Sequence, residues 1–191
     1  MDSYHIALFF HVLALIVAAG ATAIIKLSLV RRARARTVGE MLEWHSILMK
    51  ISVLFPISLA VFVLSGGYMV GKAHIAWSTG FIVAGLTGVG VLLAAGTVLG
   101  VTGKALKLRL EALAAQGANQ PAPPLKAPPV ISLLPFANTG LVIGVVFDMA
   151  TKPLSVPTAL TVIAIGFGAG AAFGRMVGVA RPATVNEAES A

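Results

Sequence analysis

The chain has 191 residues, of which 58% are hydrophobic and 11% charged, and its mean hydropathy is +0.94. A soluble domain carries about 25% charged residues, so the composition excludes an ordinary soluble protein and indicates an all-α integral membrane protein in a single domain. The net charge of +7 is divided among short loops without interleaved aromatic residues, which excludes nucleic acid as a partner, and the lack of cysteine excludes disulfides, thiolate metal sites and iron–sulfur clusters.

Five apolar runs are each long enough to cross a ~30 Å hydrocarbon core as a helix rising about 1.5 Å per residue. They cover residues 6–30, 47–70, 77–101, 130–149 and 154–175. The first run has no basic residue before it and is followed by arginines, so it is interpreted as a retained span and not as a cleaved signal peptide. The sequence therefore predicts one transmembrane domain over residues 1–181, built as a helical bundle of five spans in the lipid bilayer.

Lysine and arginine are strongly asymmetric about these spans. Twelve of the 14 lie at or near the same ends of the runs, and Lys72 and Lys152 are the two exceptions. Loops rich in Lys and Arg stay in the cytoplasm, which predicts an outer N-terminus and a cytoplasmic C-terminus in a bacterial inner (plasma) membrane. Lys26 and Lys50 lie inside spans close to the cytoplasmic ends, where a long stem can extend to the interface.

The connections differ in character along the chain. Residues 37–46 predict an interfacial lead-in to the second span. The third helix is expected to continue into the cytoplasm through Ala115, because Leu106, Leu110 and Leu113 recur at helical spacing. A proline-rich linker over residues 116–129 is expected to be flexible or polyproline-like, and residues 182–191 to be a disordered tail.

Glycines at four-residue spacing predict where helices pack, because a stripe without side chains lets another backbone approach closely. The fifth span carries Gly166, Gly170, Gly174 and Gly178, and the third carries Gly96 and Gly100. Two interpretations remain open: packing within the chain, which is favoured, or contact with a membrane-protein partner or a second copy through the glycine face of the fifth span.

His11 is the leading candidate for a cofactor site, because an ionisable residue inside a span is expensive and is often functional. Its imidazole could ligate haem iron or a metal, or relay a proton. His74 in the following outer loop is the one histidine placed to act as a second ligand, if that loop folds inward, and Met69 or Met149 would complete a copper site. The alternative is a histidine hydrogen-bonded to a neighbouring helix with no further role.

A thin polar seam is predicted along the fourth span. Asp148 lies four residues before Lys152, which would allow an ion pair at the outer end, and Asn138 could hydrogen-bond across the bundle. No serine-hydrolase, metalloprotease or phosphate-loop motif is present. The sequence therefore predicts no catalytic residue and favours a protein that is not an enzyme.

Several segments resemble a group of bacterial integral membrane proteins without assigned function, related to the copper-resistance-D-like membrane proteins. These segments are Phe10-His11-Val12-Leu13, Arg31-Arg32-Ala33-Arg34, Pro56 with Leu64 to Met69, Trp77, and Met149 to Pro153. The resemblance covers residues 5–153 and extends distantly to a haem-dependent protoporphyrinogen oxidase. It implies a small inner-membrane bundle and a haem or copper role at His11. The oxidase's later lysine and its arginine signature have no counterpart, so oxidase activity is not implied.

Three functions are compatible with these observations. The first is a non-enzymatic structural, accessory or small-ligand-binding bundle. The second is a haem b- or copper-binding membrane protein using His11. The third is a small transporter subunit, for which the glycine-rich third and fifth spans are the single hint.

Overall fold

The structure is a computed structural model of the chain and describes residues 2–124 and 129–179. Within them it contains six helices: α1 (Ser3–Ala33), α2 (Val38–Ser52), α3 (Leu54–Lys72), α4 (Gly80–Gln116), α5 (Pro129–Thr151) and α6 (Val156–Val179). With α2 and α3 taken together, they form 5 spans long and apolar enough to cross a membrane. The predicted all-α fold with five membrane helices is confirmed. The tail predicted to be disordered, residues 182–191, lies outside the described part.

The first two spans begin at capping residues. The Asp2 carboxylate accepts a hydrogen bond from the Tyr4 backbone N–H at 3.2 Å at the start of α1. At the start of α2, Thr37 Oγ1 accepts from the Glu40 N–H at 3.2 Å, while the Glu40 carboxylate accepts from the Arg36 N–H at 3.0 Å. These contacts satisfy donors that lack partners in the first helical turn. The predicted lead-in over residues 37–46 is therefore the first part of a helix.

The second span is interrupted where α2 ends at Ser52 and α3 begins at Leu54. Pro56 explains the interruption, because proline has no N–H to donate to the carbonyl four residues earlier and its ring crowds that carbonyl. Ser52 Oγ donates to the Met49 carbonyl at 2.8 Å beside the break. The second span thus consists of two consecutive helices, α2 and α3, that run in the same direction.

Helix α4 continues beyond the apolar run, as predicted, and has 37 residues. At about 1.5 Å per residue it is roughly 55 Å long, well beyond a ~30 Å hydrocarbon core. Its last part carries the partly exposed Lys107–Glu111 ion pair at 3.5 Å and, next to it, the fully buried Leu110. The helix therefore reaches out of the membrane with its amphipathic segment packed on the bundle.

The segment after α4 is more ordered than the sequence predicts. The backbone N–H groups of Val38 and Gly39 donate to the carbonyls of Gln120 and Ala118 at 3.0 and 2.9 Å, and the Ala122 N–H donates to the Arg36 carbonyl at 2.9 Å. Residues 117–122, here called the strap, thus cross the start of α2. The expectation of a flexible linker is wrong for the strap, because backbone pairing with the α1–α2 connection holds it. Residues 125–128 of that linker lie outside the described part.

Glycine packing is found between α5 and α6. A Cβ on Gly166 would collide with the Gly140 carbonyl, one on Gly170 with the Phe136 carbonyl, and one on Gly174 would lie 2.9 Å from Phe136 Cβ. The glycine face of α6 therefore packs within the chain, as the favoured interpretation predicted. A partner that used this face would have to displace α5. The surroundings of Gly178 lie outside the described part.

The packing role predicted for Gly96 and Gly100 is wrong within this chain. A Cβ on either would meet nothing within 4 Å, because no neighbouring helix covers that face of α4. Gly85 and Gly88 hold the close contacts, with an added Cβ 2.7 Å from Met149 Cε and from Val145 Cγ2, respectively. Gly85 and Gly88 therefore pack on α5, while Gly103, farther along α4, packs on α2, where an added Cβ would lie 2.9 Å from Met49 Sδ.

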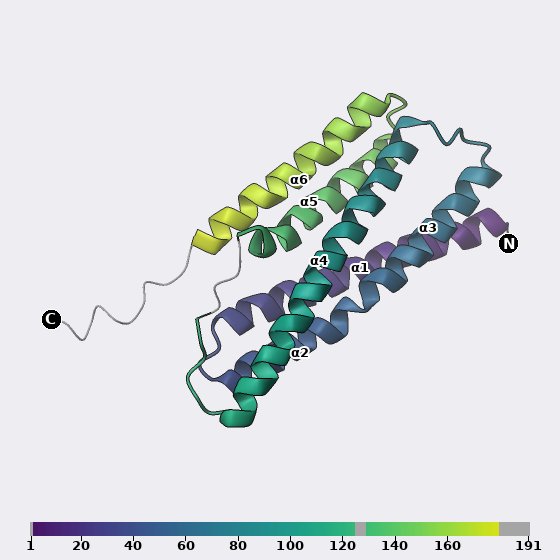
Figure 1. Cartoon of the computed structure of the whole chain (residues 1–191). Helices are drawn as coiled ribbons and strands as arrows, with labels where there is room; N and C mark the ends of the chain where they lie inside the picture. Colours follow the sequence, from purple (N-terminus) through teal and green to yellow (C-terminus); the bar gives the residue numbers. More distant parts are fainter. Residues whose placement is uncertain (1, 125–128, 180–191) are drawn as a thin grey trace.

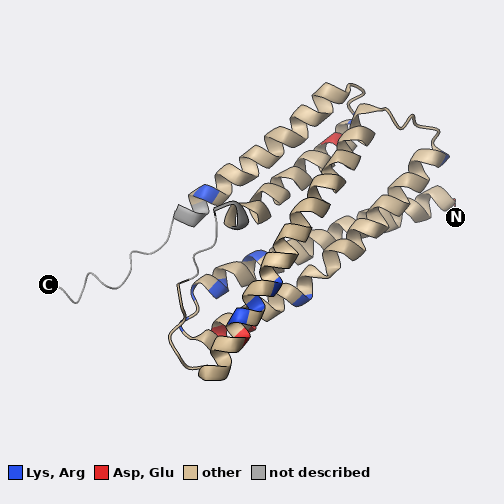
Figure 2. Ribbon diagram, viewed as in Figure 1, with Lys and Arg blue, Asp and Glu red and all other residues tan. Residues whose placement is uncertain are grey.

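The helices form two groups connected by α4 (Figure 1). Helix α1 packs against α2 and α3, α5 packs against α6, and α4 contacts α2, α5 and α6. At the start of α4, the N–H groups of Gly80 and Phe81 donate to the carbonyls of Leu154 and Pro153 in the α5–α6 turn, each at 3.0 Å. Figure 2 shows most Lys and Arg residues gathered at one end of the molecule, around the end of α1, α2 and the end of α4.

Candidate functional site

His11 is held between α1 and α3 by specific contacts. Its Nδ1 lies 3.1 Å from the Phe62 carbonyl oxygen and 3.1 Å from Ser65 Oγ, and its ring stacks on Phe62 with centroids 3.8 Å apart. The Ser65 hydroxyl itself donates to the Val61 carbonyl at 2.6 Å. Nδ1 must therefore carry the proton and donate, which leaves Nε2 as the lone-pair nitrogen.

This arrangement resembles the outer hydrogen bond of a metal-ligating histidine, in which the non-ligating N–H donates to a carbonyl and fixes the ring. It is also what the alternative of a structural histidine requires. Gly66 lets the ring approach α3, since a Cβ there would lie 3.0 Å from His11 Cε1. Nε2 is therefore the nitrogen of His11 that could act as a ligand.

The other predicted ligands do not contact His11 within the described residues. His74 is exposed and has φ 50° in the turn after α3. That turn closes on α3 itself, with the Ala73 N–H donating to the Met69 carbonyl at 2.9 Å. The end of α3 is already roughly 9 Å beyond Gly66 by helix rise, and the Ile75 N–H donates to the Val70 carbonyl at 3.1 Å, which holds the loop at that end of α3. In residues 2–124 and 129–179 no cluster of three or more His, Cys, Asp or Glu is assembled for a metal.

The predicted polar seam is not connected. Asp148 is 0% exposed, yet neither of its carboxylate oxygens has a hydrogen-bond partner among the described residues. The expected ion pair with Lys152 is absent there because α5 ends at Thr151 and Lys152 has φ 51°, which turns its exposed side chain off the helical face of Asp148. Asn138 Oδ1 is likewise buried without a partner.

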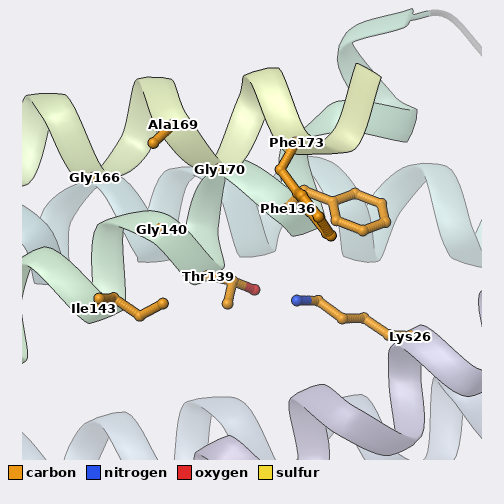
Figure 3. Close-up of a pocket in the computed structure, with 9 residues that line it drawn as sticks. All are labelled: Lys26, Phe136, Thr139, Gly140, Ile143, Gly166, Ala169, Gly170 and Phe173. Atoms are coloured by element: carbon orange, nitrogen blue, oxygen red, sulfur yellow. The ribbon is translucent and has the colours of Figure 1, made fainter. Parts of the chain in front are cut away.

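A groove that the sequence did not predict lies between α1 and the α5–α6 pair (Figure 3). Its volume is about 340 Å³. The groove is open to the exterior, since two of its lining residues, Ile143 and Phe173, are 65% and 53% exposed. The groove, here called the Lys26 groove, is lined by Lys26, Phe136, Thr139, Gly140, Ile143, Gly166, Ala169, Gly170 and Phe173.

Lys26 supplies the one charged group in this lining. Its side chain crosses the gap toward Thr139 of α5 (Figure 3), and its Nζ lies 5.3 Å from the centre of the Phe136 ring. Lys26 is therefore directed across the gap to α5. No ion pair or hydrogen bond to this ammonium is found within the described residues. Its contact there is the cation–π interaction with the Phe136 ring.

A second cavity of about 460 Å³ lies between α4 and the α5–α6 pair and serves as a comparison. Its lining has no ionisable side chain, and its hydroxyl, from Thr87, already donates to the Val83 carbonyl at 2.8 Å. Binding sites combine apolar walls with a few polar groups that orient the ligand. The Lys26 groove meets that description and the second cavity does not.

A buried polar contact joins three helices at the cation-rich end. His45 is 1% exposed; its Nδ1 accepts from Arg32 Nη1 at 2.7 Å, and its Nε2–H donates to the Gly103 carbonyl at 2.8 Å. This arrangement requires a neutral imidazole with the proton on Nε2. The sequence does not indicate these partners, because Arg32 and Gly103 come from α1 and α4.

No family model, curated protein or solved structure matches this chain. The resemblance to the copper-resistance-D-like proteins therefore stays a prediction that rests on its short motifs. The site has to be argued from its own geometry.

Proposed function

We propose that this protein is a non-enzymatic accessory bundle of the bacterial inner membrane that binds a small amphipathic ligand in the Lys26 groove. The main observation behind this proposal is the groove itself, which is open to the exterior and has apolar walls. These walls surround a single cation that has no ionic partner in the described residues. The second cavity offers a similar space but no group to orient a ligand. The concentration of cations at one end supports placing that end in the cytoplasm, which a reporter fused after Gln116 would check by being active in the cytoplasm.

The ligand is tested by native mass spectrometry of protein purified in mild detergent. Ala169 is exposed and lines the Lys26 groove, so Ala169→Phe is expected to fill it and to lower the amount of retained ligand several-fold. Ala164→Phe is the matched control, because Ala164 is exposed on the same helix but lines the second cavity. Wild-type protein without an adduct, or an adduct that Ala169→Phe leaves unchanged, would contradict the proposal.

The second candidate is haem or metal binding through His11, favoured by the Nδ1 contacts that leave Nε2 unprotonated. Purified protein would then show a Soret band or stoichiometric copper, and His11→Ala would abolish it. His5→Ala is the control, since His5 is an exposed histidine of the same helix. Absence of both signals from protein expressed with haem precursor and copper would eliminate this candidate and leave His11 as a contact between α1 and α3.

A further inference from the structure

We propose that the occupant of the Lys26 groove is one anionic phospholipid, with its phosphate on Lys26 Nζ and an acyl chain along the α5–α6 wall. This inference rests on the proposed function, because it names the ligand class for the same groove. It follows from three properties of the groove: a cation with free donors, a wall of small and apolar residues, and a lining without acids.

The cation has donors available. A lysine ammonium carries three N–H donors, and the recorded interaction of Lys26 is with the face of Phe136 at 5.3 Å. The nearby Thr139 hydroxyl donates its own hydrogen to the Pro135 carbonyl at 2.9 Å. Lysine binds phosphate as a point charge, and an ionisable residue within a span is normally paired or marks a site. A phosphate with several oxygens would supply the missing partners.

The wall suits an extended hydrocarbon chain. Gly140, Gly166 and Gly170 bring the backbones of α5 and α6 close together, and the side chains that line the groove between them, from Thr139 and Ala169, are small. Phe136 and Phe173 lie at one end of it, with ring centroids 6.2 Å apart, and Ile143 lies toward the other end (Figure 3). An acyl chain lying on such a surface gains dispersion contacts along its length.

Charge distinguishes the lipid headgroup that fits. None of the residues that line the groove is acidic, and Lys26 gives it a net positive charge. Basic pockets between transmembrane helices bind the headgroups of anionic lipids. A zwitterionic lipid adds a positive group that this groove has no acid to receive. Free phosphate would leave the apolar walls uncovered.

The test measures lipid selectivity by native mass spectrometry of delipidated protein titrated with phosphatidylglycerol, phosphatidylcholine or oleate. Wild-type protein is expected to prefer phosphatidylglycerol over phosphatidylcholine by about tenfold, because both lipids offer a phosphate to Lys26 and the choline group adds a repulsion between like charges. Lys26→Gln should abolish this preference while still binding lipid, and Lys26→Arg should retain it. Lys50→Gln removes the same charge from an exposed site on α2 and should leave the preference intact.

Other results of this titration would contradict either the choice of lipid or the proposed function itself. Equal affinity for both phospholipids in wild-type protein, or the same loss in Lys26→Gln and Lys50→Gln, would refute recognition by Lys26 while the groove remains a lipid site. Stronger binding of oleate would replace the phospholipid with a fatty acid. Lipid binding that Ala169→Phe does not reduce would refute the proposed function itself.

Discussion

Gly140→Ala is expected to destabilise the protein by about 3 kcal/mol, the upper range for forcing an atom into a packed interior. The new methyl group would overlap the Gly166 carbonyl and lie 3.0 Å from the Gly170 nitrogen. Both are backbone atoms, so no side-chain rotation can relieve the overlap, and α5 and α6 must separate. Unfolding in SDS, followed by circular dichroism, would report the change in free energy.

Gly96→Ala is the matched control for this substitution. It introduces the same methyl group into a membrane helix where nothing lies within 4 Å, and we expect a change within about 0.5 kcal/mol. Equal effects of the two substitutions would mean that the α5–α6 contact is not the tight interface described. A large effect of Gly96→Ala alone would identify the open face of α4 as a contact with another molecule.

His45→Ala is expected to cost about 3 kcal/mol, because Arg32 Nη1 and the Gly103 carbonyl lose their partner and the ring leaves a cavity. His45→Gln should recover part of this loss, since an amide can also accept one hydrogen bond and donate another. The same SDS titration measures both variants. His5→Ala removes an exposed histidine and should be close to neutral.

A double-mutant cycle isolates the contact between Arg32 and His45. Arg32→Met keeps much of the aliphatic stem and removes the donor, so the combined variant should lose less stability than the two single changes added together, by at least about 0.5 kcal/mol. Strict additivity would show that the 2.7 Å contact contributes nothing to stability.

The helices could be predicted because the signal is local. Five apolar runs and the positions of the cations determine which segments cross the bilayer, and α4 reaches Gln116 as the spacing of Leu106, Leu110 and Leu113 indicated. Prolines were less decisive: Pro56 divides the second span into α2 and α3, whereas Pro135 lies inside α5. Length and hydropathy do not distinguish those two outcomes.

The candidate site could not be predicted, because it depends on which helices become neighbours. In the sequence, Lys26 is only a lysine near the end of a helix. Its role in the groove becomes visible when the fold places Phe136 and Thr139 of α5 opposite it. His45 finds its partners on α1 and α4, at sequence separations of 13 and 58 residues. The predicted Asp148–Lys152 ion pair failed for a different reason. The spacing of the two residues suits a helix, but α5 ends at Thr151, one residue before Lys152.

The course of α4 has a mechanical consequence. Its first turn is hydrogen-bonded to the α5–α6 turn through Gly80 and Phe81, and Gly103 far along the same helix accepts from His45. No loop interrupts the stretch between these two attachments. A change in the tilt of the α5–α6 pair would therefore be transmitted along α4, as along a rigid rod, to its contact with His45 at the cation-rich end.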